Sequence, residues 1–178
     1  HAGVEKANDG TLTIADTNQY NGSLTATGGQ GGAGIGGGVF SDSNGNNITV
    51  SGGTITATGG EHSAGIGGGG SNSGNNNASN ITISGGDVTA IGSIYASGIG
   101  GELNGSNITI SNGKVTAIGG DQGGAGIGGG LWYSGSDITI SGDAHVKSQG
   151  GTSNKYTGAG GGIGNGGAGN TNGDEVEP

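Results

Sequence analysis

Several residue types that commonly organise a fold or a binding surface are missing from this 178-residue chain, which has no Cys, no Met, no Arg and a single Pro. Without Cys the fold gains no disulfide, although a protein without disulfides can still be secreted. The single Pro and the lack of a Gly-X-Y triplet repeat exclude a collagen helix. Basic residues are scarce: the chain has four Lys and thirteen Asp and Glu, which gives a net charge of −9. Such a charge repels phosphate backbones and argues against nucleic acid as a partner.

Long apolar segments are also lacking, since hydrophobic residues make up only 28% of the chain. No apolar run approaches the roughly 18 residues of a membrane span, and no charged-then-apolar segment opens the chain as in a signal peptide. We therefore expect no membrane insertion. The segment "NTNGDEVEP" predicts an acidic C-terminal linker over residues 167–178, which leaves residues 1–166 as one domain.

Glycine is abundant, with 51 residues, and its placement is periodic, which argues against a disordered low-complexity chain. Three short units recur in a fixed order. The first alternates aliphatic residues with Thr, the second ends in Thr-Ala, and the third is the motif Ala-Gly-Ile-Gly. In one passage they are Ile48-Thr49-Val50, Ile55-Thr56-Ala57-Thr58 and Ala64-Gly65-Ile66-Gly67. Alternation with a period of two predicts β-strands.

The repeat length identifies the fold. From Ile48 the first unit recurs after 33, 27 and 30 residues, which is the size of one solenoid coil with its loops. Three short strands per coil and about five coils predict an all-β, single-stranded parallel β-helix without substantial helix. The crossover rule for parallel strands predicts a right-handed winding. The length changes fall between the third unit and the next first unit, so insertions gather on one edge.

Strand alternation predicts which side chains fill the core. Ile48, Val50, Ile55, Ala57, Ala64 and Ile66 should point inward, and Thr49, Thr56, Thr58, Gly65 and Gly67 outward. A column of Asn47, Asn80, Asn107 and Asp137 stands immediately before the first unit of each coil. It looks like the internal asparagine ladder of parallel β-helices, in which stacked amides satisfy the backbone of a corner.

One outward face carries regular Thr columns. Coils stack about 4.8 Å apart and alternate residues of a strand lie about 7 Å apart. The result would be a flat grid of methyl and hydroxyl groups that resembles the ice-binding face of antifreeze solenoids. Its residues are Thr25, Thr27, Thr56, Thr58, Thr89, Ile91, Thr116 and Ile118. A plainer interpretation is that Thr suits any exposed β-surface.

The third unit forms a second candidate surface. If Gly34, Gly65, Gly98 and Gly126 and their partners two residues later point outward, one face is free of side chains. Small residues in these columns also suit a narrow coil without any ligand. Five of the six aromatic rings lie in the loops that flank this unit, and rings stack on pyranose faces while acidic and amide side chains bind hydroxyls. The candidate ligand-binding residues are Phe40, Glu61, His62, Tyr95, Glu102, Asp121, Gln122, Trp132 and Tyr133.

Catalytic and metal patterns are weak. The three His, at positions 1, 62 and 145, have no ligand spacing. Once the strand alternation assigns each residue to a face, no pair of acidic residues has the spacing of a catalytic pair, and no residue stands out as a general base. We expect no enzyme activity, no cofactor and no metal.

The motifs "GGAGIGGG", "NITISGG" and "TATGG" recur with small variations over residues 23–164. This repeat resembles glycine-rich right-handed β-helix modules of large surface proteins of Gram-positive bacteria. That resemblance implies an exported, wall-attached, adhesin-like and carbohydrate-binding setting, within a larger surface protein. The expected partner is a host or environmental glycan. Two alternatives stay open: an ice-binding domain that uses the Thr face, and a passive structural stalk.

Overall fold

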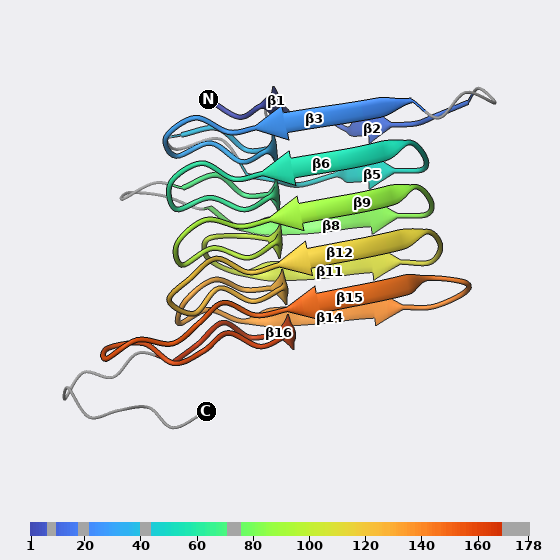
Figure 1. The fold of residues 1–178 in the computed structure, drawn as a ribbon. Helices are drawn as coiled ribbons and strands as arrows, with labels where there is room; N and C mark the ends of the chain where they lie inside the picture. Colours follow the sequence, from blue (N-terminus) through green and yellow to red (C-terminus); the bar gives the residue numbers. More distant parts are fainter. Residues whose placement is uncertain (7–9, 18–21, 40–43, 71–75, 169–178) are drawn as a thin grey trace.

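The computed structural model is a parallel β-solenoid that winds right-handed from β1 at one end to β16 at the other (Figure 1). It describes residues 1–6, 10–17, 22–39, 44–70 and 76–168. All of its regular elements are strands, arranged in three parallel sheets. The predicted fold class is confirmed.

Each sheet stacks equivalent strands from successive coils. Sheet A contains β1 (Val4–Glu5), β4 (Ile35–Gly36), β7 (Ile66–Gly67), β10 (Ile99–Gly100), β13 (Ile127–Gly128) and β16 (Ile163–Gly164). Sheet B contains β2 (Leu12–Ile14), β5 (Ile48–Val50), β8 (Ala78–Ile83), β11 (Gly105–Ile110) and β14 (Gly135–Ile140). Sheet C contains β3 (Ser23–Thr27), β6 (Thr54–Thr58), β9 (Asp87–Ile91), β12 (Lys114–Ile118) and β15 (His145–Gln149). We number the coils 1 to 5 by the sets that begin at β2, β5, β8, β11 and β14.

The register of the parallel strands places equivalent residues of successive coils side by side. Ile48 lies beside Ile81, and Ile81 beside Ile108. The β-branched residues Ile, Val and Thr suit a strand, and their alternation places the aliphatic ones inside. Ile48, Val50, Ile55, Ala57, Ala64 and Ile66 are buried, with exposed fractions of 2% or less, as predicted. Stacked columns of small and medium side chains therefore form the slender core.

Tight corners join sheet B to sheet C. Gly53, Gly86 and Gly113 occupy these corners with φ of 87°, 95° and 87°. A residue with a Cβ rarely adopts this conformation, so glycine sets the corner. The same corner geometry in successive coils keeps the strands in register.

The asparagine column forms a ladder, but on the outside of the solenoid. The Asn80 amide donates a hydrogen bond to Asn47 Oδ1 at 2.9 Å, and the Asn107 amide donates to Asn80 Oδ1. Asn80 and Asn107 are exposed, and their φ values of 56° and 50° place a left-handed residue directly before the buried Ile81 and Ile108. Asn tolerates this conformation better than most residues. The prediction of an internal ladder is wrong, because the left-handed residue turns the side chain outward.

A second asparagine ladder satisfies the corner backbone instead. Asn77 Oδ1 accepts hydrogen bonds from the backbone and side-chain amides of Asn104, and Asn104 Oδ1 accepts from the backbone N–H of Ser134. Asn165 Oδ1 accepts from the backbone N–H of Gly135 at 3.1 Å. The role expected of the first column is therefore carried by these residues.

The glycine columns are buried, so the prediction of a bare outward face is wrong. Every member is buried: Gly34, Gly65, Gly98 and Gly126 in one column, Gly36, Gly67, Gly100 and Gly128 in the other. A Cβ placed on Gly36 would lie 2.1 Å from Gly67 O, and one on Gly45 would lie 1.8 Å from Gly67 C. The chain thus packs backbone against backbone here: a Cβ on Gly34 would lie 2.6 Å from Thr58 N of sheet C, and the connection that carries Gly45 runs over Gly67. Strand alternation alone does not reveal that cover.

Candidate functional site

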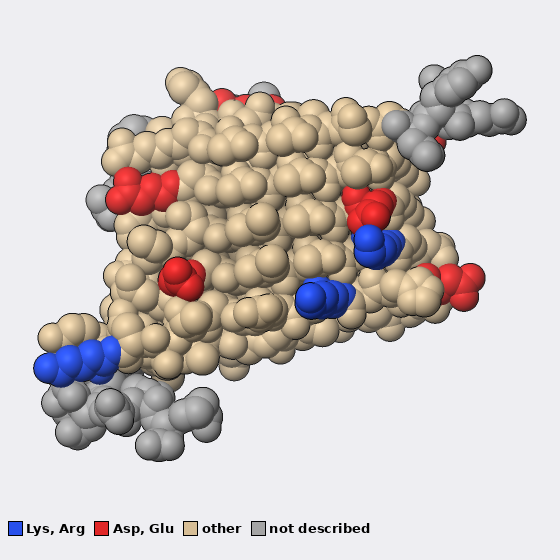
Figure 2. Space-filling model, in the orientation of Figure 1, with Lys and Arg blue, Asp and Glu red and all other residues tan. Residues whose placement is uncertain are grey.

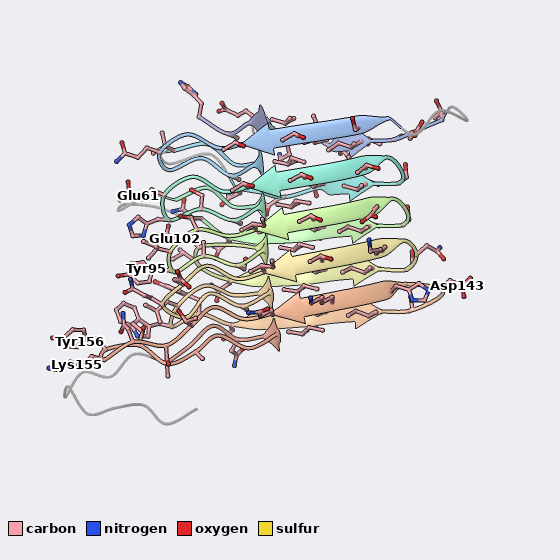
Figure 3. The ribbon with its side chains drawn as sticks, viewed as in Figure 1. Glu61, Tyr95, Glu102, Asp143, Lys155 and Tyr156 are labelled. Atoms are coloured by element: carbon pink, nitrogen blue, oxygen red, sulfur yellow. The ribbon has the colours of Figure 1, made fainter. Side chains whose placement is uncertain are left out.

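The loops that leave sheet C turn at one edge of the solenoid, on the left in Figure 3, before they return as the strands of sheet A. We call this the loop edge and define it by the side chains that the turns and their neighbouring connections present there. They are Gln30, Glu61, His62, Asn76, Tyr95, Glu102, Asp121, Gln122, Trp132, Tyr133, Thr152, Asn154, Lys155 and Tyr156. Eight of the nine predicted ligand-binding residues belong to it. The ninth, Phe40, lies outside the described residues.

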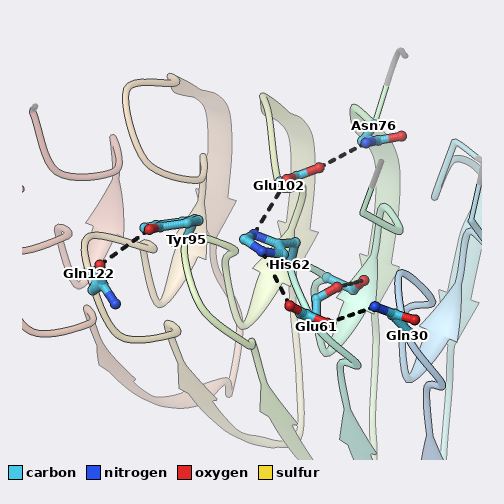
Figure 4. A network of polar contacts seen from close by, with 8 residues as sticks. Gln30, Glu61, His62, Asn76, Tyr95, Glu102 and Gln122 are labelled. Atoms are coloured by element: carbon cyan, nitrogen blue, oxygen red, sulfur yellow. Dashed lines mark hydrogen bonds and ion pairs between the residues drawn. The ribbon is translucent and has the colours of Figure 1, made fainter. Parts of the chain in front are cut away.

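Coils 1 to 3 are connected along the loop edge by carboxylates (Figure 4). The Gln30 amide donates to Glu61 Oε2 at 3.0 Å, and the Asn76 amide donates to Glu102 Oε2 at 2.8 Å. His62 lies between the two carboxylates, with Nε2 3.8 Å from Glu61 Oε1 and Nδ1 3.9 Å from Glu102 Oε1. The network holds two acidic side chains and one imidazole in fixed positions.

An aromatic contact continues the network into the next coil. The rings of His62 and Tyr95 have centroids 5.1 Å apart and are tilted by 33°. The Tyr95 hydroxyl donates to Gln122 Oε1 at 3.3 Å, and the Asn154 amide donates to the same oxygen at 2.6 Å. A row of polar contacts therefore runs across the turns of successive coils.

Three further aromatic side chains on this edge are exposed. Trp132 is 67% exposed, Tyr133 38% and Tyr156 59%. Trp132 follows Leu131, whose backbone N–H donates to Tyr95 O at 2.7 Å. The Lys155 ammonium lies 5.6 Å from the centroid of the Tyr156 ring. The ring of Trp132 is therefore open to solvent.

The backbone at these aromatic positions is strained. In the turns of coils 1 to 4 the residue three positions after the first glycine has a left-handed backbone: Gly31 (φ 69°), His62 (58°), Tyr95 (69°) and Gln122 (67°). Trp132, in the neighbouring connection, has φ 68°. A bulky residue in this region costs about 1–2 kcal/mol relative to an ordinary conformation. Coil 1 meets the same requirement with glycine, so the fold itself does not need the rings.

The predicted Thr grid is arranged as expected on sheet C. Thr25, Thr56, Thr89 and Thr116 stand in one column, and Thr27, Thr58, Ile91 and Ile118 in the next. The first column ends at Lys147 and the second at Gln149. Figure 2 shows this side of the molecule as a broad face with few charged side chains. The grid and the loop edge are separate surfaces.

Sequence reasoning missed several members of the loop edge. Gln30 occupies the same turn position as Glu61, so the repeat could have identified it. Asn76, Thr152 and Asn154 come from connections that differ between coils, and their place becomes apparent only from the hydrogen bonds. The Thr152 hydroxyl, for example, donates to Asp121 Oδ1 at 2.9 Å.

Neither a metal site nor a membrane span is found among the described residues. No group of three or more His, Cys, Asp and Glu side chains in this part of the chain is arranged to hold a metal ion. Over the same residues, no helix is long and apolar enough to cross a membrane.

Comparison with known proteins gives one match. A family model described as a beta helix repeat matches residues 20–39, 48–70, 81–106 and 108–131, which together make up more than half of the chain. The four matched segments follow the coils of the solenoid. No curated protein and no solved structure matches the chain.

Proposed function

The chain belongs to the beta helix repeat family, and from that premise we propose that it is a non-catalytic adhesion module that binds glycan at the loop edge. The binding surface of this proposal consists of the exposed aromatic loops and excludes the buried glycine columns. Its setting is a larger protein exported to the cell surface or attached to the wall of a Gram-positive bacterium.

The observation that carries the proposal is the strained backbone beneath the rings. His62, Tyr95 and Trp132 keep large side chains at φ values of 58–69°, where glycine would be more stable. Strain of this kind persists where the side chain has another use, and binding sites are a common place for it. The ring of Trp132 is open to solvent and those of His62 and Tyr95 are half-buried, so all three are accessible while they are held at a stability cost, which supports a role in binding.

The chemistry around the rings supports a sugar as the ligand. A pyranose has an apolar face that stacks on an aromatic ring and hydroxyls that need hydrogen-bond partners. Glu61 and Asp121 are exposed next to the rings, and Gln122 is half-buried beside Tyr95. Glu61 and Glu102 are already oriented by amide donors, which reduces the entropy lost when a ligand binds. The acidic edge favours neutral over anionic glycans, because like charges repel.

Retention on a glycan array tests the proposal. Tyr95→Asn and Trp132→Asn remove a ring yet keep a residue that tolerates the left-handed backbone. We expect each to weaken binding about tenfold, which corresponds to about 1.4 kcal/mol of lost stacking. Asp137→Asn is the matched control, since it changes a left-handed position with φ 52° that lies in β14 of sheet B and not among the loop-edge residues. The proposal fails if no glycan is retained, or if both ring variants bind like the unaltered protein.

Ice is a second candidate ligand, supported by the register of the Thr grid. Strand pairing aligns four Thr in one column, and the two columns of the grid have no charged side chain before Lys147, although the neighbouring column of the same face carries the Asp87–Lys114 ion pair. An ice-binding module would inhibit ice recrystallisation, and Thr56→Tyr or Thr89→Tyr would abolish this by disrupting the flat grid. Tyr95→Asn would leave it unchanged. A passive stalk would neither be retained on the glycan array nor inhibit ice recrystallisation.

A further inference from the structure

The hydrogen bonds around Asn154, on the loop edge of coil 5, determine which way its amide points. Asn154 Oδ1 accepts from the backbone N–H of Tyr156 at 2.8 Å, and from the backbone N–H and the hydroxyl of Thr157 at 2.9 and 3.0 Å. A backbone N–H can only donate, so the atom that faces it is the amide oxygen. The nitrogen of Asn154 must therefore be the atom that faces Gln122 in coil 4.

The orientation of the Gln122 amide follows from that of Asn154. Asn154 Nδ2 lies 2.6 Å from one end of the Gln122 amide, and an amide nitrogen donates without accepting, so this end is the oxygen, Oε1. The Tyr95 hydroxyl lies 3.3 Å from the same oxygen and therefore donates its hydrogen to it. The three side chains thus have one consistent arrangement of donors and acceptors.

This arrangement leaves the nitrogen of Gln122 as a donor for a ligand. Figure 4 shows Nε2 directed away from Tyr95, and within the described part of the chain it makes no hydrogen bond. Gln122 is half-buried, so the amide is held by its neighbours and is still accessible. A fixed N–H donor is therefore present beside the Tyr95 ring.

The groups that a sugar can place at this donor differ in polarity. A hydroxyl rotates to suit either a donor or an acceptor, an acetamido carbonyl only accepts, and an ammonium only donates. On the same edge, the carboxylates of Glu61 and Asp121 are oriented by the Gln30 amide and the Thr152 hydroxyl. Charge alone therefore favours an ammonium group over an acetamido group at this acidic edge. A preference for the acetamido group has to come from the Gln122 donor.

We propose that Gln122 is a specificity-determining residue of the loop edge, whose Nε2 donates to the acetamido carbonyl of an N-acetylated hexosamine. The inference rests on the proposed function and adds the substrate class to it. The Tyr95 ring beside this donor supplies the apolar contact for the sugar. Asn154 is a positioning residue, because it holds the Gln122 amide with its nitrogen toward the ligand.

Gln122→Glu tests the donor with almost no change in shape. The variant keeps an oxygen that accepts from Tyr95 and Asn154 but presents a carboxylate oxygen in place of Nε2. The probes are immobilised N-acetylglucosamine and N-acetylgalactosamine, each paired with its free-amine form at neutral pH. We expect the unaltered protein to prefer the acetylated forms, and the variant to lose about tenfold in affinity for them and to prefer the amines. Gln149→Glu makes the same chemical change at the exposed end of β15 and should leave the preference unchanged.

Asn154→Asp tests the positioning role without changing Gln122. An aspartate keeps the oxygen that accepts from Tyr156 and Thr157, but its second oxygen replaces the nitrogen that faces Gln122. The Gln122 amide should then turn, donate to this oxygen and present Oε1 to the ligand. We expect the same reversal of preference as in Gln122→Glu. A residue with only a structural role would lower the retention of both forms and leave their ratio unchanged.

The possible results separate this inference from the proposed function. If the unaltered protein retains no glycan on the array, the proposed function and this inference fail together. If it retains glycans but binds acetylated and amine forms equally, this inference alone is overturned. The same holds if Gln122→Glu keeps both its far-UV spectrum and the preference of the unaltered protein. If Gln122→Glu does not fold, Asn154→Asp is read by the same criteria.

Discussion

Sheet C and the glycine-rich sheet A are made by the same repeat, yet they fill space in different ways. On sheet C, side chains such as Val88 and Ala90 occupy the interior while Thr89 faces solvent. In sheet A, the other face of the strands packs against backbone, and a Cβ on Gly67 would lie 1.9 Å from Gly100 O. A substitution therefore has a small effect where side chains face water and a large one where backbone meets backbone.

Gly100→Ala should have the largest effect on stability. Gly100 has φ 136°, and its added Cβ would lie 2.0 Å from Gly128 O. Backbone strain and overpacking together should lower the free energy of unfolding by about 3–5 kcal/mol. Gly164→Ala is the matched control, since Gly164 has φ 111° but nothing within 4 Å of the added Cβ. Urea denaturation compares them, and equal losses would show that backbone packing is not the cause.

Asn80→Ala should have an intermediate effect. The change removes two ladder hydrogen bonds and leaves a less tolerant residue at φ 56°. We expect a loss of about 1–2 kcal/mol. Asn80→Gly keeps the backbone conformation accessible, so its loss should be smaller and should report the ladder alone. An Asn80→Gly variant that is the less stable of the two would contradict this account.

Tyr95→Asn should change stability in the opposite direction. Replacing a ring at φ 69° with a residue that tolerates this region should raise the free energy of unfolding by about 0.5–1 kcal/mol. The gain should accompany the loss of glycan retention. A thermal melt that moves to lower temperature would mean that the Tyr95 ring stabilises the fold, which would weaken the argument for a binding role.

Thr89→Ala should have the smallest effect. Thr89 lies in the middle of the Thr grid with its side chain on the solvent face. We expect a change within about 0.5 kcal/mol. A urea midpoint that reveals a loss above about 1 kcal/mol would show that the face is held by side-chain contacts that the backbone ladder does not explain.

The same contrast explains what the sequence could predict. Ile81, Val88 and their equivalents recur with a period of two, so their strands and their burial follow from the pattern. The Ala-Gly-Ile-Gly unit was also predicted as a strand, but not the cover over Gly67, because that depends on the path of the connection that carries Gly45. The left-handed backbone that points Asn80 outward could not be predicted, because a two-residue period gives the face of a side chain only for extended residues.

The candidate site was predicted in its residues but not in its geometry. Their positions beside the repeated Ala-Gly-Ile-Gly unit placed Glu61, His62, Tyr95 and Trp132 in loops on one edge. The contact of His62 with Glu102 joins two coils 40 residues apart in the sequence, and it depends on how connections of different length place the two side chains. The supporting amide of Asn76 belongs to the most variable connection, where no repeat exists to identify it.

The stacking of the coils also determines how the molecule would carry a mechanical load. β1 and β16 lie at opposite ends of the axis, so tension between them acts along the direction in which the backbone hydrogen bonds point (Figure 1). These bonds would then open one coil at a time. Each opening would release about 30 residues and lengthen the chain by about 100 Å. A force-extension record should show repeated small steps, and a single rupture would contradict this. An adhesion module built this way would yield gradually under flow while the coils that remain folded keep their loops.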